Sequence, residues 1–354
     1  MPAQRILING QLFEVRQNHY DFLIAAQQHA FSGAFWIDQI CVDQDNVPEK
    51  NHQVTMMASI YKRALKVVVW LGGLTEEQEP IMPYIELRML TEYGGGPTVT
   101  IETQGGGTYG PSLSTVIEFF QNPYWTRMWI VQELVTSQDF TAYGARNSIS
   151  GWALRCFAVW LDDHVPAREN TQLMSPHVNY LLTRAPNGSA RYLLSDLFYH
   201  LSQGQCWDPK DRLYSLRALL TNGTSVVVDY SKPVTDVLLD AVRLIGRETT
   251  ARIGLHAIAA VGTTSGMAAH VLACDLPKAM GLGTSRHLFE ELARDVDGDW
   301  NRALQQGDGE EWIVAKFRET FLEHGGSVDE VEAASMSYAE PNLRAELDWH
   351  GILR

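Results

Sequence analysis

An aspartate stands in the middle of an apolar run near the start of the chain. The run reads FWIDQICVDQ, residues 35–44, with Asp38 at its centre, and its length and its aromatic and branched side chains predict a buried strand. An unpaired buried carboxylate is costly, so Asp38 needs a partner. Three basic residues lie on neighbouring predicted elements: Arg63, Lys66 and Arg127. We expect Asp38 near the carboxyl end of a strand, held by a basic side chain, either in a ligand site or in a structural ion pair.

Other catalytic patterns are weak in this sequence. It contains no GxSxG and no P-loop, and GLGTSR at Gly281 matches only the first two glycines of a dinucleotide pattern. LDDHV at Asp162 lacks the third acid of an aspartate-rich magnesium site. The four cysteines are far apart, with no CxxC pair and no histidine at ligand spacing. We therefore expect no metal site and a reducing compartment.

The composition limits the function classes. The chain has 354 residues, 45% of them hydrophobic, which is enough for a substantial core and more than one domain. The formal charge of −14 repels polyanions and argues against a nucleic-acid partner. The sequence holds no signal peptide and no run of about 18 apolar residues, so we predict no membrane span. We expect a cytoplasmic protein whose partner is a small-molecule ligand or another protein. The protein partner can be a second copy of the same chain in a homo-oligomer.

The first 150 residues alternate between strand and helix patterns. Residues 5–15 flank Asn9-Gly10, a hairpin signal, and Asn18 can cap the helix that follows. Residues 54–65 carry an amphipathic helical stripe, and KVVVWLGG at 66–73 is a short apolar strand. With the run at 35–44 they predict a βαβ unit and a parallel sheet.

The rest of the chain is predicted as mostly helical. Residues 93–111 hold two GGG runs and predict an insertion or lid. Two helices split by NPYW at 122–125 and the strand DFTAYG are expected next. A helix from Asp208 to the Asn222-Gly223 pair, the strand SVVVDYS at 225–231 and a helical stripe over 234–245 follow.

Several of these segments resemble the fungal heterokaryon-incompatibility (HET) domain. FWIDQICVDQ is similar to the family's W-I-D-x-I-C-I-N-Q, HQVTMMASIYKRA to its H-Q-V-x-M-M-x-x-I-Y-x-x-A, and VVVWLG to its V-x-V-W-L-G. NPYWTRMWIVQEL, CWDPKDRLYSLRALL and VDYSKPVTDVLLDA are similar to later blocks. The resemblance implies an α/β, TIR-like domain over 1–150 with a mainly parallel sheet flanked by helices. A mostly helical region over 151–354 follows, of which 186–245 also resembles HET-family proteins.

The resemblance also implies a site. Some TIR domains, which are distant relatives of the HET domain, hydrolyse NAD with a glutamate on a helix after a tryptophan. By that analogy Glu133 is the catalytic candidate together with Asp38, and Trp129, Arg127 and Trp36 are the cofactor-binding candidates. In this interpretation NAD is a substrate, and Glu133 supports the positive charge that forms as nicotinamide leaves. For each of these residues a core or ion-pair role is the alternative.

Two family segments are missing from the sequence. These are the first strand, roughly L-S-Y-x-W-G, before ILING, and the P-S-W-x-P-D-W segment after the last matched helix. Three functions stay open at this point. The first is a signalling or cell-death module of fungal incompatibility, the second an NAD glycohydrolase using Glu133, and the third a small-molecule enzyme of fungal secondary metabolism.

Overall fold

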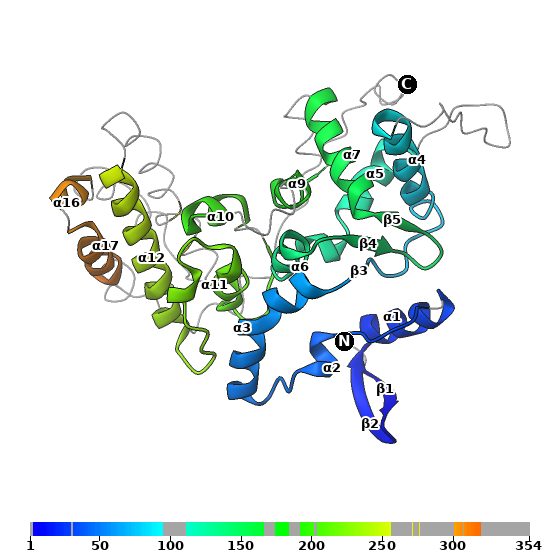
Figure 1. Ribbon diagram of the computed structural model, residues 1–354, viewed down its shortest axis with the longest axis horizontal. Helices are drawn as coiled ribbons and strands as arrows, with labels where there is room; N and C mark the ends of the chain where they lie inside the picture. The colour runs from blue at the N-terminus through cyan, green and yellow to red at the C-terminus, as the bar shows by residue number, and fades with distance from the viewer. Residues whose placement is uncertain are drawn as a thin grey trace. The chain divides into compact units, whose positions relative to one another are not determined.

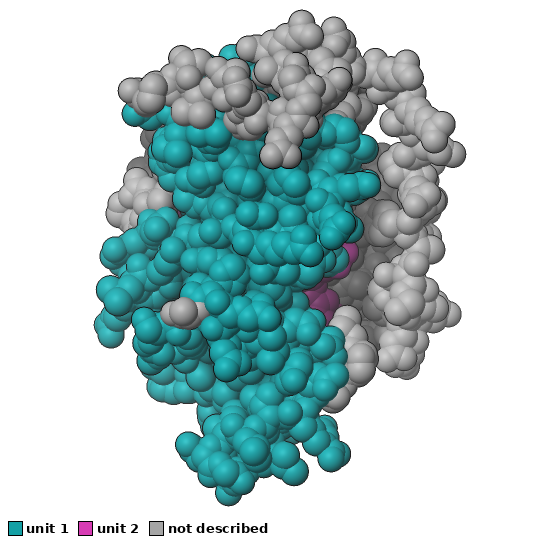
Figure 2. Space-filling view, turned by 90° about the vertical axis from the view of Figure 1, so that its right-hand side faces the viewer, with its two compact units in different colours: residues 1–126, 133–188, 346–354 teal, residues 127–132, 189–345 magenta. Residues whose placement is uncertain are grey.

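The chain folds into two compact units. The computed structural model describes residues 3–29, 31–94, 111–165, 174–183, 192–201, 204–255, 301–306 and 308–319, and positions 271 and 276. The first unit comprises Met1–Thr126, Glu133–Gly188 and Glu346–Arg354, and the second comprises Arg127–Gln132 and Ser189–Ala345. Figure 2 shows the first unit in teal and the second in magenta. The predicted glycine-rich lid at 93–111 lies almost wholly outside the described residues.

The chain begins with the predicted hairpin. Strands β1 (Ala3–Ile8) and β2 (Gln11–Arg16) pair antiparallel. Asn9 and Gly10 both have positive φ, 51° and 81°, as a tight two-residue hairpin turn requires. Helix α1 (Gln17–Gln28) follows and packs against both strands (Figure 1). The Asn-Gly signal was therefore sufficient to place the turn.

The strand predicted at residues 35–44 is wrong. Residues 35–37 are irregular, Asp38–Cys41 form the helical turn α2, and helix α3 runs over Val47–Arg63. Asn46 caps α3 by accepting a 3.2 Å hydrogen bond from the backbone N–H of Glu49. An aspartate favours the first turn of a helix, where the N-terminal dipole stabilises its charge, over the middle of a strand. The predicted βαβ unit therefore lacks its first strand.

A three-stranded sheet forms the centre of the first unit. Its order is β3 (Val67–Trp70), β4 (Phe140–Tyr143) and β5 (Ser148–Ser150). The β3–β4 pair is parallel and the β4–β5 pair antiparallel. Three helices, α4 (Ile81–Tyr93), α5 (Leu113–Phe120) and α6 (Ile130–Thr136), lie in the chain between β3 and β4, together with the 3-10 turn η1 (Pro123–Thr126). The predicted α/β class is confirmed, with one parallel and one antiparallel pairing in this sheet.

Helices and aromatic side chains bury the sheet. Helix α7 (Gly151–His164) begins directly after β5, capped by the Ser150 hydroxyl, and α4 and α7 pack on each other and on β5 (Figure 1). Helix α9 (Pro176–Thr183) packs on α7. The core includes the fully buried side chains Phe119, Trp125, Phe140, Phe157 and Trp160. These aromatic side chains therefore fill the interior of the unit.

The described part of the second unit is mostly helical. Its described elements are α10 (Leu194–Leu201), α11 (Asp211–Tyr214), η2 (Arg217–Leu219), η3 (Gly223–Ser225), α12 (Val234–Leu255), α16 (Asn301–Gln306) and α17 (Gly309–Phe317). Helix α12 packs on α10 and α17 and buries the predicted apolar stripe. The single helix expected from Asp208 is wrong, because the segment divides into α11 and η2. The strand expected at 225–231 is also wrong.

Within the described part of the chain, the helices include none that combines the length and the apolar character needed to cross a bilayer.

Candidate functional site

Asp38 is the first residue of α2 and is partly exposed. Its Oδ1 atom accepts a 2.7 Å hydrogen bond from the backbone N–H of Gln39 and lies 4.0 Å from Nε2 of His19 on α1. The side chain retains 43% of its exposure. The predicted position at the end of a sheet strand is therefore wrong, and the basic side chain beside Asp38 is a histidine. A carboxylate that keeps this much water needs no arginine to neutralise it.

Glu133 lies in the first turn of α6 and is half-buried. Its Oε2 atom accepts a 3.0 Å hydrogen bond from the hydroxyl of Tyr124, which belongs to η1. The neighbouring Trp125 is fully buried and donates its indole N–H to the carbonyl of Phe119 at 3.0 Å. Trp125 is thus a core residue. A hydroxyl donor to the carboxylate stabilises its charged form and fixes its orientation.

The candidate cofactor-binding residues are divided between the two units. Trp36 is half-buried in the first unit, and its ring meets Tyr61 of α3 edge-on at 5.8 Å. Arg127 and Trp129 belong to the second unit, together with the short bridge that joins Arg127 to Gln205. Arg127 is exposed and Trp129 half-buried. The structure thus gives Trp36 a packing contact, and it places Arg127 in a backbone bridge.

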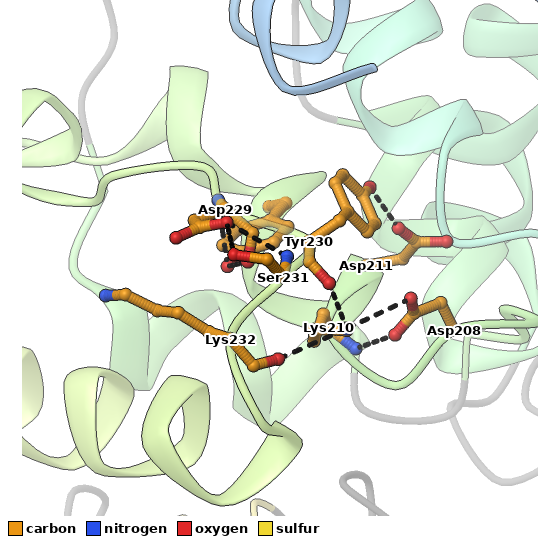
Figure 3. Close-up of polar contacts among 8 residues, drawn as sticks. Asp208, Lys210, Asp211, Asp229, Tyr230, Ser231 and Lys232 are labelled. Atoms are coloured by element: carbon orange, nitrogen blue, oxygen red, sulfur yellow. Dashed lines mark hydrogen bonds and ion pairs between the residues drawn. The ribbon is translucent and has the colours of Figure 1, made fainter. Parts of the chain in front are cut away.

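A polar network in the second unit joins two segments that the sequence separates. Lys210 lies between α10 and α11, and its ammonium donates to the carbonyl of Tyr230 at 2.8 Å and to that of Lys232 at 3.3 Å. It also lies 3.6 Å from Oδ2 of Asp208 (Figure 3). Lys210 therefore connects the segment CWDPKDRLY to the segment VDYSK. Lys210 is largely buried, so its contacts count more than those of a surface ion pair.

Two tyrosines complete this network. The Tyr230 hydroxyl donates to Oδ1 of Asp211 at 2.5 Å, and the Tyr214 hydroxyl donates to the carbonyl of Asp229 at 3.0 Å. Burial raises the pKa of Tyr214 to about 12, and burial together with Asp211 raises the pKa of Tyr230. Both phenols therefore stay protonated and act as donors at physiological pH. The two tyrosines therefore connect the segments as hydrogen-bond donors.

The described pocket lies beside this network, against α12. It has a volume of about 270 Å³ and is lined by Ser225, Val226, Val227, Lys232, Asp240, Arg243, Leu244 and Arg247. Asp240 holds two of the cations, with Lys232 Nζ at 2.9 Å and Arg243 at 3.0 Å. Arg247 is paired with Glu310 of α17 at 2.8 Å. Three cations and one carboxylate line the pocket, so it can hold an anion.

Sequence reasoning missed this pocket. The helix over 234–245 was predicted from its apolar residues alone. Beside those residues, Asp240, Arg243 and Arg247 fall at positions i, i+3 and i+7. That spacing puts three charged side chains on one helix face and was the available signal. Cys206, in the segment with Asp208 and Asp211, is a poor nucleophile, because burial raises the pKa of its thiol to about 11. The arrangement is therefore suited to binding.

The first unit is thus an α/β domain with a small mixed sheet, and the second is a mostly helical unit with a charged pocket. Residues 1–133 match the family model described as heterokaryon incompatibility protein (HET). Residues 1–133 are therefore similar to the heterokaryon incompatibility family, as the FWIDQIC and HQVTMMASIY segments predicted. The similarity seen further along, over 186–245, stays a prediction.

A curated relative shows a similarity of the same kind. Heterokaryon incompatibility protein 6, OR allele, of Neurospora crassa is 49% identical to this chain over 47 residues. The matched segment is 13% of this chain and 7% of the relative, so the chain spans only a small part of that protein's length. No solved structure matches the chain.

Proposed function

We propose that this protein is a signalling module of fungal heterokaryon incompatibility, which promotes cell death when it is engaged. One observation carries the proposal: the family match over residues 1–133, which includes the whole FWIDQIC to VVVWLG block. The name of the Neurospora crassa relative points to the same process. We further propose that the protein acts in the cytoplasm, where its described thiols, including the exposed Cys41, stay reduced.

Contacts with other proteins are the mechanism that the geometry supports best. The hairpin exposes an apolar cross-strand pair, Leu7 and Leu12, at 70% and 69%. Phe35, at the start of the family motif, is 41% exposed. Such residues favour association with a partner or with a second copy of the chain. The carboxylate of Asp38 accepts a backbone N–H and lies 4.0 Å from His19 of α1, an arrangement that a structural role explains.

The experiment is inducible expression of the full chain in a filamentous fungus, with cell viability measured at matched protein levels. We expect the wild-type chain to reduce viability. Trp36→Ala removes the ring that packs on Tyr61 within the family motif, so this variant should lose the effect. Trp207→Ala is the matched control, because Trp207 is 96% exposed and lies outside residues 1–133. Full viability of cells that express folded wild-type protein would contradict the proposal.

A further inference from the structure

The pocket against α12 is built from one helix face and two loops. Asp240, Arg243, Leu244 and Arg247 line it from α12, and Val226 and Val227 from the extended segment after η3. Residues three and four apart on a helix share a face, so the charged members converge on the same space. Lys232 reaches the pocket from the loop before α12. Figure 3 shows the Lys232 ammonium pointing away from Lys210, while its carbonyl faces the network.

The charges in the pocket are unbalanced. Lys232, Arg243 and Arg247 contribute three positive charges, and Asp240 contributes one negative charge. Asp240 uses one oxygen for each of two cations: Oδ2 for Lys232 and Oδ1 for Arg243. A lysine has three donors and an arginine five, so each keeps N–H groups that Asp240 does not use. Glu310 pairs with Arg247 at the edge of the pocket, so the three cations face two carboxylates, and one positive charge and several N–H donors remain in excess.

Structural ties hold the pocket walls in place. Arg217 donates a 2.7 Å hydrogen bond to the carbonyl of Val226, which fixes the extended segment. Lys210 fixes the carbonyl of Lys232 at 3.3 Å. Glu310 of α17 holds Arg247 from the side at 2.8 Å, and the side chain of Arg247 is still 56% exposed. Preorganised cations lose less entropy when they bind a ligand than mobile surface cations do.

We propose that this pocket binds a phosphate dianion, either as inorganic phosphate or as the phosphate group of a small monoester. Arg243 and Arg247, one helical turn apart, and the Lys232 ammonium supply the kind of charged N–H donors that bind a phosphate group. Val226, Val227 and Leu244 supply an apolar wall for a short carbon chain. The volume of about 270 Å³ lies just below the range of about 300–1,000 Å³ for drug-sized ligands and favours a small one. This binding site lies outside residues 1–133 and is independent of the incompatibility role.

The test is calorimetric titration of the intact protein at fixed ionic strength. The titrants are inorganic phosphate and glycerol 3-phosphate, with glycerol and chloride as blanks. We expect at least one phosphate compound to bind and Arg243→Gln to weaken that binding by about tenfold or more. Arg318→Gln is the charge-matched control, because Arg318 is an exposed residue of the same unit outside the pocket. This variant should leave the affinity unchanged.

A second pair of variants avoids disturbing the ion pairs. Val227 is 65% exposed at the pocket, so its replacement should leave folding intact. Val227→Asp adds a negative charge and should weaken phosphate binding. Val227→Asn introduces a side chain of the same shape as aspartate but without the charge, so it should weaken phosphate binding less. If neither phosphate compound binds the wild-type protein, the proposal fails. It fails equally if Arg243→Gln and Val227→Asp both bind phosphate as tightly as the wild type does.

Discussion

The backbone N–H of Leu194 donates a 2.7 Å hydrogen bond to Oε2 of Glu248, which ties the first residue of α10 to α12 across 54 positions of sequence. Glu248 is only 3% exposed. Its Oε1 atom has no hydrogen-bond partner among the described residues. Burial raises the pKa of this carboxyl to about 7, with Asp196 contributing in the same direction and the Leu194 N–H opposing it. Folding therefore favours the protonated form of Glu248.

The Glu248 site makes stability depend on pH. The pKa of Glu248 is higher in the folded chain than its ordinary value of 4.5. The stabilisation that Glu248 contributes to the folded state is therefore complete below about pH 4.5 and is lost as the pH rises through about 7. Glu248→Gln stays neutral throughout. Relative to wild type, we expect this variant to gain roughly 3 kcal/mol between about pH 4.5 and pH 8. Urea unfolding followed by tryptophan fluorescence at several pH values measures the difference. Glu311→Gln, on the exposed face of α17, should show no such trend.

Glu79 is expected to hold the turn between β4 and β5. Its side chain, 5% exposed, accepts the backbone N–H groups of Arg146 at 3.2 Å and Asn147 at 3.0 Å, and the Asn147 amide at 3.0 Å. Glu79→Ala would leave these donors unpaired, so we expect a loss of about 2–4 kcal/mol in the free energy of unfolding. Glu76→Ala is the control, since the Glu76 side chain is 87% exposed and its pair with Arg146 lies in solvent. Equal effects of the two substitutions in chemical denaturation would refute this role.

Gly151 lets helix α7 start directly on the sheet. A Cβ atom at this position would lie 2.6 Å from the Phe140 ring and 2.9 Å from the Phe140 carbonyl oxygen. Both elements are buried in the core, so Gly151→Ala must displace β4 or α7 and should destabilise the protein by about 1–3 kcal/mol. Gly73→Ala is the matched control, since a Cβ atom at Gly73 would meet nothing within 4 Å. Thermal unfolding of the two variants distinguishes them, and a Gly151→Ala variant as stable as wild type would show that the contact relaxes freely.

Local signals in the sequence were sufficient where the conformation of an element depends only on residues close to it in the sequence. Asn9-Gly10 specified the hairpin through its turn geometry, and the short apolar run in KVVVWLGG specified β3, whose Val67 and Val69 are buried. The run at 35–44 misleads because a short apolar stretch carries no period long enough to separate a strand from an extended loop and a helical turn. Asp38 was the discordant residue in that run. It marked the first position of α2.

The segment at 225–231 misleads for a different reason. Its side chains alternate as a strand's would, with Val226, Val228 and Tyr230 buried and Val227 exposed. Two of its backbone carbonyls accept hydrogen bonds from side chains and not from a neighbouring strand. Arg217 donates to the carbonyl of Val226, and Lys210 donates to that of Tyr230. The period of the segment was thus predictable. Its hydrogen-bond partners, Lys210 and Arg217, lie on a separate segment, so no local pattern could reveal them.

A substitution of Glu133 distinguishes most clearly between signalling through protein contacts and cleavage of NAD. Glu133→Gln removes the charge but keeps an oxygen that can accept the hydrogen bond of the Tyr124 hydroxyl, so the fold should be preserved. If the protein signals through contacts, this variant reduces cell viability as much as wild type does, and neither protein releases nicotinamide from NAD. Viability at matched expression and nicotinamide release by purified protein measure the two activities. Loss of both activities in a Glu133→Gln protein with an unchanged unfolding midpoint would place Glu133 at a catalytic centre and overturn the contact mechanism.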